Sequence, residues 1–179
     1  CCGHNSAKLT FFNTIDKVKA KINNLDVVRK ALEVVSKDEA ARTCTSLVET
    51  SVPDLVVAFQ RLCECVYPQI EGAKPLKRNV FQRLDDGNKL WHDLVGKGYD
   101  DWITDAQYAK LRKCFQQRHL LQHQDGIVDQ DYITKSGDVS YQVGQHLIIK
   151  AEDITEYAEI VENLGKQVLA LLEEVKANE

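Results

Sequence analysis

Hydrophobic positions recur along most of this chain at the spacing of an α-helix. In the segment 8–35 they lie three or four residues apart, which predicts a helix with a local irregularity at Asn23-Asn24. The segment 37–67 repeats the pattern, but Pro53 falls inside it, with Ser51 and Asp54 as a capping signal, so we expect a restart or a kink there. The segment 154–175 has the most regular spacing and predicts a long final helix.

The segment between these long helices reads as shorter elements. We expect a short helix over 77–84, a turn at Asp85-Asp86-Gly87 and a helix over 88–95 that Gly96 ends. The fold class predicted from the whole pattern is all-α, a bundle of about four to five helices over residues 8–179.

One further helix begins at a capping box formed by Thr104 and Gln107 and extends to about His123. Beyond Gly126 the pattern changes. Residues 127–141 are rich in Asp, Ser and Gly and read as a loop, and residues 145–150 read as strand-like. A small irregular or β-like insertion should therefore precede the last helix.

Composition fits one globular domain and limits the partners. Hydrophobic residues make up 44% and charged residues 28%, and no apolar run reaches the ~20 residues that cross a bilayer. The net charge of −4 argues against a protein that coats nucleic acid through bulk charge, so any RNA contact needs a local basic patch.

The cysteines indicate a reducing compartment and leave the first residues open to two interpretations. Four of them lie inside helical patterns without the spacing of a disulfide framework, which favours the cytoplasm: Cys44, Cys63, Cys65 and Cys114. The opening Cys1-Cys2-Gly3-His4 fits either the remnant of an upstream zinc ribbon over 1–7 or a truncated start.

The helix over 104–123 carries the candidate chemistry. Arg118 falls in the middle of its apolar arc, where an unpaired guanidinium is costly unless a carboxylate, a subunit interface or a phosphate offsets it. Arg112, His119 and His123 line one edge of that arc. An imidazole can move protons near neutral pH and a guanidinium can hold a phosphate, which are the parts that RNA cleavage without a metal requires.

The run Arg118-His119-Leu120-Leu121-Gln122-His123 resembles the Arg-x4-6-His motif of the HEPN superfamily (higher eukaryotes and prokaryotes nucleotide-binding). The following segment 124–129 and Tyr132 are similar to the residues after this motif in some uncharacterised HEPN proteins. The resemblance covers roughly residue 79 to the C-terminus, and reaches the first two helices only through their architecture.

This resemblance implies an all-α endoribonuclease that needs no metal or other cofactor. It assigns Arg118 to the phosphate, His123 to acid–base catalysis and His119 to the polar helper position. Arg112, on the same edge of the helix, is expected to support substrate binding. It also implies a homodimer through the motif-bearing helices, RNA as substrate, an antitoxin or other protein partner, and a role in phage defence or a toxin system.

Other interpretations of the same residues stay open. Arg118 could pair with a core carboxylate, and His123 could be a helix C-terminal residue that the helix dipole favours. His119 and His123 have the spacing of a metal pair but no evident third ligand. Arg118 and His123 lie about 140° apart around an ideal helix. A non-catalytic HEPN-like module that binds RNA, nucleotides or proteins is the alternative function, and a plain structural bundle is the third.

Overall fold

Eight α-helices make up the computed structural model, which describes the backbone of residues 2–177 and the side chains of residues 6–173. The helices are α1 (Cys2–Asn23), α2 (Leu25–Glu33), α3 (Lys37–Val66), α4 (Leu84–Val95), α5 (Tyr99–Trp102), α6 (Asp105–His123), α7 (Gln130–Ser136) and α8 (Ala151–Ala177). Two 3-10 turns, η1 (Tyr67–Gln69) and η2 (Val80–Gln82), connect α3 to α4. The all-α class is confirmed. The helices outnumber the expected four to five because the first segment divides at Asn24 and because α5 and α7 are short helices that the pattern did not predict.

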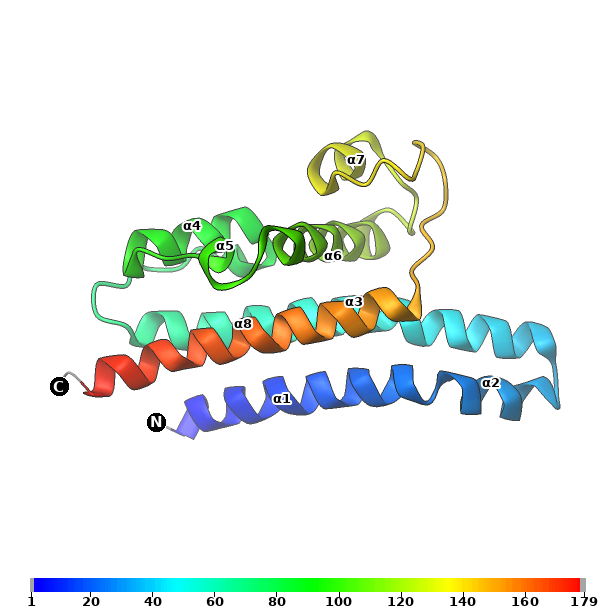
Figure 1. The fold of residues 1–179 in the computed structure, drawn as a ribbon, viewed down its shortest axis with the longest axis horizontal. Coiled ribbons are helices and arrows are strands. Elements are labelled where there is room, and N and C mark those ends of the chain that lie inside the picture. The colour runs from blue at the N-terminus through cyan, green and yellow to red at the C-terminus, as the bar shows by residue number, and fades with distance from the viewer. Residues whose placement is uncertain (1, 178–179) are drawn as a thin grey trace.

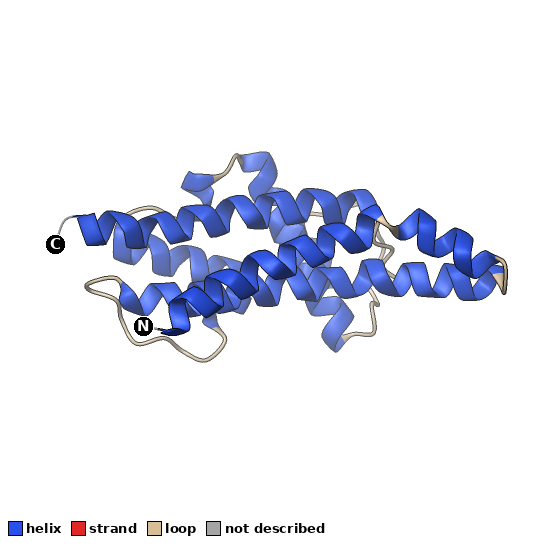
Figure 2. Ribbon diagram, turned by 90° about the horizontal axis from the view of Figure 1, so that it is seen from below, coloured by secondary structure: helices blue, strands red, loops and turns tan. Residues whose placement is uncertain are grey.

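The long helices form the body of the molecule, with α3 at its centre. α1 and α2 follow one another and run antiparallel to α3 and α8, as Figures 1 and 2 show. α3 contacts α1, α2, α6 and α8, and its residues Leu55, Phe59 and Leu62 are fully buried. α4, α5 and α6 lie on the opposite side of α3 from α1 (Figure 1), and α6 contacts α3 directly. One face of α6 is therefore buried while another remains open to a ligand.

α3 continues without interruption through Pro53, so the expected restart is absent. Proline removes one intrahelical hydrogen bond, which usually disfavours a helix interior. Here the helix is packed against neighbours on several sides, and this packing outweighs the local cost. Ser51 does not cap a new helix. Its hydroxyl donates to the carbonyl of Leu47 at 2.7 Å instead.

An aromatic cluster packs α4 against the two 3-10 turns and α5. Trp91 is fully buried beside Tyr67 and Phe81, and its indole N–H donates to the hydroxyl of Tyr99 at 3.1 Å. The expected turn at 85–87 is instead the first turn of α4. Two aspartates are favoured there by the positive end of the helix dipole, so the sequence signal for a turn was also a signal for a helix start.

The insertion before α8 contains α7 and a small core of its own. Asp129 caps α7 by accepting from the backbone N–H of Tyr132 at 2.7 Å. Within residues 2–177 the insertion forms no strand, only a single antiparallel bridge between Ile127 and His146, so the strand-like prediction is not confirmed. Leu120 of α6 packs against Tyr132 and Leu147, which joins the insertion to the end of α6.

Asp138 ties the insertion to α6 from the other side. Its carboxylate pairs with Lys113 of α6 at 3.0 Å and accepts from the hydroxyl of Tyr132 at 3.0 Å, and its side chain is only 8% exposed. Burial alone would raise the pKa of Asp138, but these interactions and the hydrogen bond from Ser140 outweigh it and lower the pKa to about 2. The carboxylate therefore stays ionised at all ordinary pH values.

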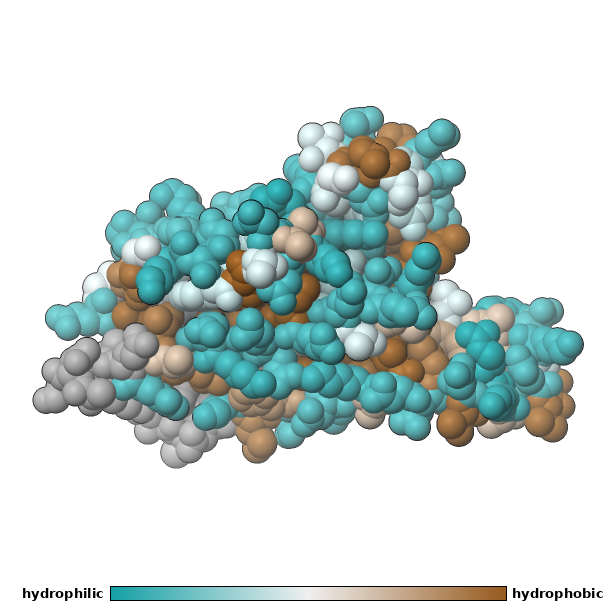
Figure 3. Space-filling view, in the orientation of Figure 1, coloured by the Kyte–Doolittle hydropathy of each residue, from teal (hydrophilic) through white to brown (hydrophobic). Residues whose placement is uncertain are grey.

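The surface in Figure 3 is mostly hydrophilic, with apolar atoms gathered at the α2–α3 turn and on the insertion. Val34 and Val35 at that turn and Val139 on the insertion are strongly exposed. Among the described residues, no helix combines the length and the apolar composition that a membrane span requires.

The predicted zinc half-site at Cys1-Cys2-Gly3-His4 lies outside the described side chains, and the structure does not test it.

Candidate functional site

All four predicted site residues line one cavity between α6 and the start of α4. The cavity has a volume of about 390 Å³. Arg112, Arg118, His119 and His123 come from α6, and Lys135 comes from α7. The opposite wall consists of the five consecutive residues 82–86, which cover the end of η2 and the first turn of α4. The structure thus brings the predicted residues together within a single chain.

The local sequence explains how α6 presents these side chains. The hydroxyl of Thr104 accepts from the backbone N–H of Gln107 at 3.3 Å, and the Gln107 side chain accepts from the backbone N–H of Thr104 at 3.0 Å, which is the predicted capping box. Leu111 and Cys114 are fully buried and fix the rotation of the helix. The helix ends at His123, and Gly126 follows with φ of +73°, a conformation that favours glycine.

Arg118 is buried, with 8% of its surface exposed, and it is the only buried cation among the described residues that line the cavity. Its Nε atom has no hydrogen-bond partner, and within residues 6–173 it takes part in no ion pair. Desolvation alone lowers its pKa, since no neighbouring carboxylate compensates. A guanidinium nevertheless keeps its charge at neutral pH. The core carboxylate that a purely structural arginine would need is therefore not found in the described part of the chain.

The two histidines stand side by side at the mouth of the cavity. Their ring centroids are 5.1 Å apart, as one helical turn between positions 119 and 123 allows. The pKa of His119 lies below its usual value because partial desolvation disfavours the charged ring, and because His123 and Arg118 add positive charge nearby. At neutral pH His119 is thus a neutral imidazole that can accept a proton.

The angular separation of Arg118 and His123 does not keep them apart. Both line the cavity, since the long arginine side chain reaches it from the buried face while His123 occupies the last residue of the helix. Neither unwinding of α6 nor a second copy of the chain is needed to bring these two groups into one cavity.

The other cations of the cavity each face a carboxylate. Arg83 pairs with Asp86, and Lys135 pairs with Asp131 at 2.7 Å. The Nη2 atom of Arg112 lies 3.9 Å from a carboxylate oxygen of Asp85, a loose ion pair. Arg118 differs from all of them because it is both buried and unpaired, so an anion would be bound most strongly at this position.

Sequence reasoning missed the wall contributed by 82–86 and the lysine of α7. No periodicity within one helix reveals which other helix will face it. The only usable signal was the pair of aspartates at the start of α4, which was interpreted as a turn.

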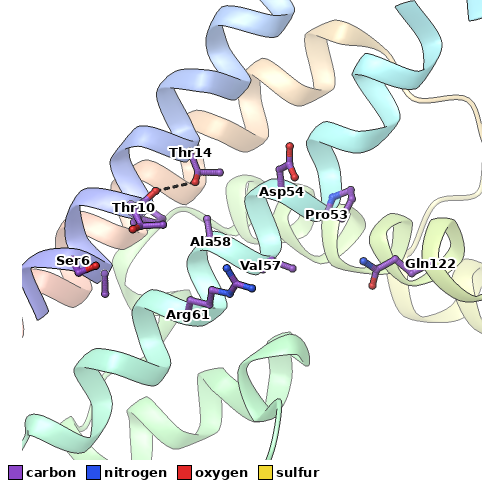
Figure 4. Close-up of a pocket in the computed structure, with 11 residues that line it drawn as sticks. Ser6, Thr10, Thr14, Pro53, Asp54, Val57, Ala58, Arg61 and Gln122 are labelled. Carbon is purple, nitrogen blue, oxygen red and sulfur yellow. Dashed lines mark hydrogen bonds between the residues drawn. The ribbon is translucent and has the colours of Figure 1, made fainter. Parts of the chain in front are cut away.

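A larger cavity, of about 630 Å³, lies between α1 and α3 and offers less chemistry (Figure 4). Thr10 and Thr14 of α1 and Pro53, Asp54 and Arg61 of α3 line it. Asp54 is already paired with Lys21 at 2.7 Å. Gln122 of α6 also lines this cavity, so the end of α6 lies between the two cavities. None of the described residues that line the larger cavity is a histidine or a cysteine, and we place the candidate site in the smaller one.

Two other groups with catalytic potential have structural explanations. Burial raises the pKa of Cys63 to about 12 and also raises that of Cys114, so neither thiol ionises to a nucleophile near neutral pH.

His92, Asp100 and Asp101 come together with the spacing of metal ligands. However, His92 is hydrogen-bonded to Asp100 at 2.7 Å, and Asp101 accepts from the backbone N–H of Gly98 at 2.8 Å as a cap of α5. These bonds account for the group without an ion.

Comparison of the chain with protein-family models, with curated proteins and with solved structures gives no match. The functional argument for this chain therefore rests on the geometry of the cavity and on the motif within α6.

Proposed function

We propose that the protein is a metal-independent endoribonuclease of the HEPN type, with its active site in the cavity between α4 and α6. The observation that carries this proposal is Arg118, a buried and unpaired guanidinium in the same cavity as two imidazoles. A phosphate group suits such a guanidinium, since it offers two oxygens in a matching geometry and full negative charge.

The reaction follows from these parts. One imidazole takes the proton of the ribose 2′-hydroxyl, whose oxygen attacks the adjacent phosphorus. The bond to the 5′-oxygen breaks, and the second imidazole protonates that leaving oxygen. Arg118 stabilises the charge that develops on the phosphate. The products are a 2′,3′-cyclic phosphate and a 5′-hydroxyl, and no metal takes part in any step.

His119 is suited to begin as the base because its lowered pKa keeps it neutral, which leaves His123 as the acid. Arg112 supports the substrate from an earlier turn of α6. The homodimer through α6, an antitoxin or other partner, and a role in phage defence or a toxin system remain predictions from the resemblance.

The test is incubation of a mixed RNA pool with the purified protein in excess EDTA. We expect cleavage to 2′,3′-cyclic phosphate ends, and we expect His123→Ala to lower the rate by about 10²–10⁴-fold, the usual contribution of a positioned acid or base. His146→Ala is the matched control, because His146 lies outside the cavity.

Three other results would have definite meanings. Full activity in His123→Ala would refute the catalytic assignment. RNA binding that depends on Arg118 without any cleavage would favour the non-catalytic binding module. Cleavage that appears only when a divalent metal is added would refute the metal-independent mechanism.

A further inference from the structure

The charges of the candidate cavity suit one phosphate and not several. Arg83, Arg112 and Lys135 each face a carboxylate, whereas Arg118 pairs with none of the described carboxylates. Asp85 and Asp86 stand on the opposite wall and would repel a second phosphate in the same space. The part of a ligand that occupies this wall must therefore be uncharged and must offer hydrogen-bond donors.

Arg112 and Tyr108 form a flat platform beside the phosphate site. The guanidinium carbon of Arg112 lies 5.1 Å from the centroid of the Tyr108 ring. The ring covers one side of the guanidinium, while Arg112 itself lines the cavity. Planar guanidinium groups are common stacking surfaces for unpaired bases. A base joined to the phosphate on Arg118 would meet this platform.

Asp85 stands at the edge of the platform, and only long contacts hold its carboxylate. One of its oxygens accepts from the hydroxyl of Tyr108 at 3.4 Å and lies 3.9 Å from Arg112. The side chain is 81% exposed, so it can turn toward a ligand. An ionised carboxylate only accepts hydrogen bonds, and its two oxygens match two donors that lie side by side.

Among the four RNA bases, guanine has the edge that fits this acceptor. Its N1–H and N2–H₂ groups point the same way and can donate to both oxygens of one carboxylate. Adenine and cytosine place a single amino group beside a ring acceptor, and uracil places its N–H between two carbonyls that the carboxylate would repel. We propose that Asp85 and Arg112 form a guanine-binding subsite beside the phosphate site of Arg118.

This inference rests on the proposed function for the phosphate position, but its test does not require cleavage. Guanosine, adenosine, cytidine and uridine 3′-monophosphates have no bond to cut, and NMR titration of the full chain gives their affinities, with inorganic phosphate as a fifth probe. We expect the guanine nucleotide to bind about tenfold or more tightly than the uracil nucleotide, as one bidentate base contact provides.

Variants separate the subsite from the phosphate site. Asp85→Asn should remove most of the guanine preference, because an amide offers one acceptor and a donor that faces the donors of guanine. Asp93→Asn, the same change on the same helix but outside the cavity, should leave the preference intact. Arg118→Ala should weaken all four nucleotides and inorganic phosphate alike.

The failures are distinguishable. Equal binding of the four nucleotides, still dependent on Arg118, would overturn the guanine subsite and leave the phosphate site standing. A preference for guanine that survives Asp85→Asn would overturn the role of Asp85. Binding of no probe, or binding that does not depend on Arg118, would overturn both the subsite and the phosphate site on which it rests.

Discussion

Replacement of Arg118 by methionine should make the protein more stable while it removes the function. Arg118 is 8% exposed, its Nε lacks a partner, and desolvation is the only effect on its pKa. Methionine has a similarly long and unbranched side chain, so it can fill the space of the arginine stem without the charge. The variant loses no ion pair among the described residues, since none is formed.

The expected magnitude follows from the cost of burying charge. Apolar replacement of buried charged groups is commonly neutral or stabilising by about 1–4 kcal/mol, whereas removal of one partner of a buried pair costs about 3–5 kcal/mol. Because the guanidinium still reaches an open cavity, we expect the low end, a gain of about 1–2 kcal/mol in the free energy of unfolding. For a chain of this size that corresponds to roughly 2–8 °C in Tm.

Urea unfolding followed by circular dichroism measures this change. The midpoint should rise with an unchanged denaturant slope, and phosphate binding should be lost. Arg61→Met is the control, since Arg61 is exposed on α3 and its replacement should change stability by no more than about 0.5 kcal/mol. A loss of 3 kcal/mol or more in Arg118→Met would show that Arg118 is a structural arginine, and the phosphate site would have to be abandoned.

Two further predictions concern the fold around the site. Asp138→Asn should destabilise the protein by about 2 kcal/mol at pH 7, because the folded pKa of about 2 lies below the ordinary value of 3.8. The stabilisation by the Asp138 carboxylate is complete above pH 3.8 and disappears as the pH falls through 2. The free energies of unfolding of the mutant and the parent, measured against pH, should therefore converge in acid. Gly165→Ala should cost about 1–3 kcal/mol, since the added methyl carbon would lie 2.3 Å from the ring of Phe11, and an unchanged urea midpoint would show that α1 does not pack so closely on α8.

The helix that carries the site was predictable in detail because its signals are local. The capping box at Thr104, the buried arc through Leu111 and the end at His123 all depend on residues within about four positions of one another. The unusual placement of Arg118 was also visible, since a charge in an apolar arc stands out on a helical wheel.

Features that depend on distant parts of the chain were predicted poorly. Pro53 was expected to interrupt α3, but tertiary packing on several sides keeps the helix continuous. Asp85 and Asp86 were placed in a turn, and nothing within their own segment indicated that they would face α6. Pairing between helices is set by the whole core, and a local pattern contains no information about it.

The exposure of the two histidines is consistent with a site that works on a large substrate. His119 and His123 are both exposed, while Arg118 beneath them is buried. A small metabolite is usually enclosed by its pocket on most sides. A phosphate within a flexible strand can instead approach an open cavity, with the buried guanidinium binding its oxygens and the exposed imidazoles next to the sugar.

This arrangement also explains why the protein keeps the buried and unpaired charge of Arg118 although it lowers stability. A core built only for stability would place an apolar residue at position 118, as the neighbouring Leu111, Cys114 and Phe115 do on the same face of α6. A buried charge without a partner lowers the stability of the free protein, yet the same lack of a partner leaves the charge available to an anion. If a carboxylate were introduced opposite Arg118, it would raise stability and block the phosphate. The absence of such a partner among the described residues is therefore better explained by ligand binding than by a structural role.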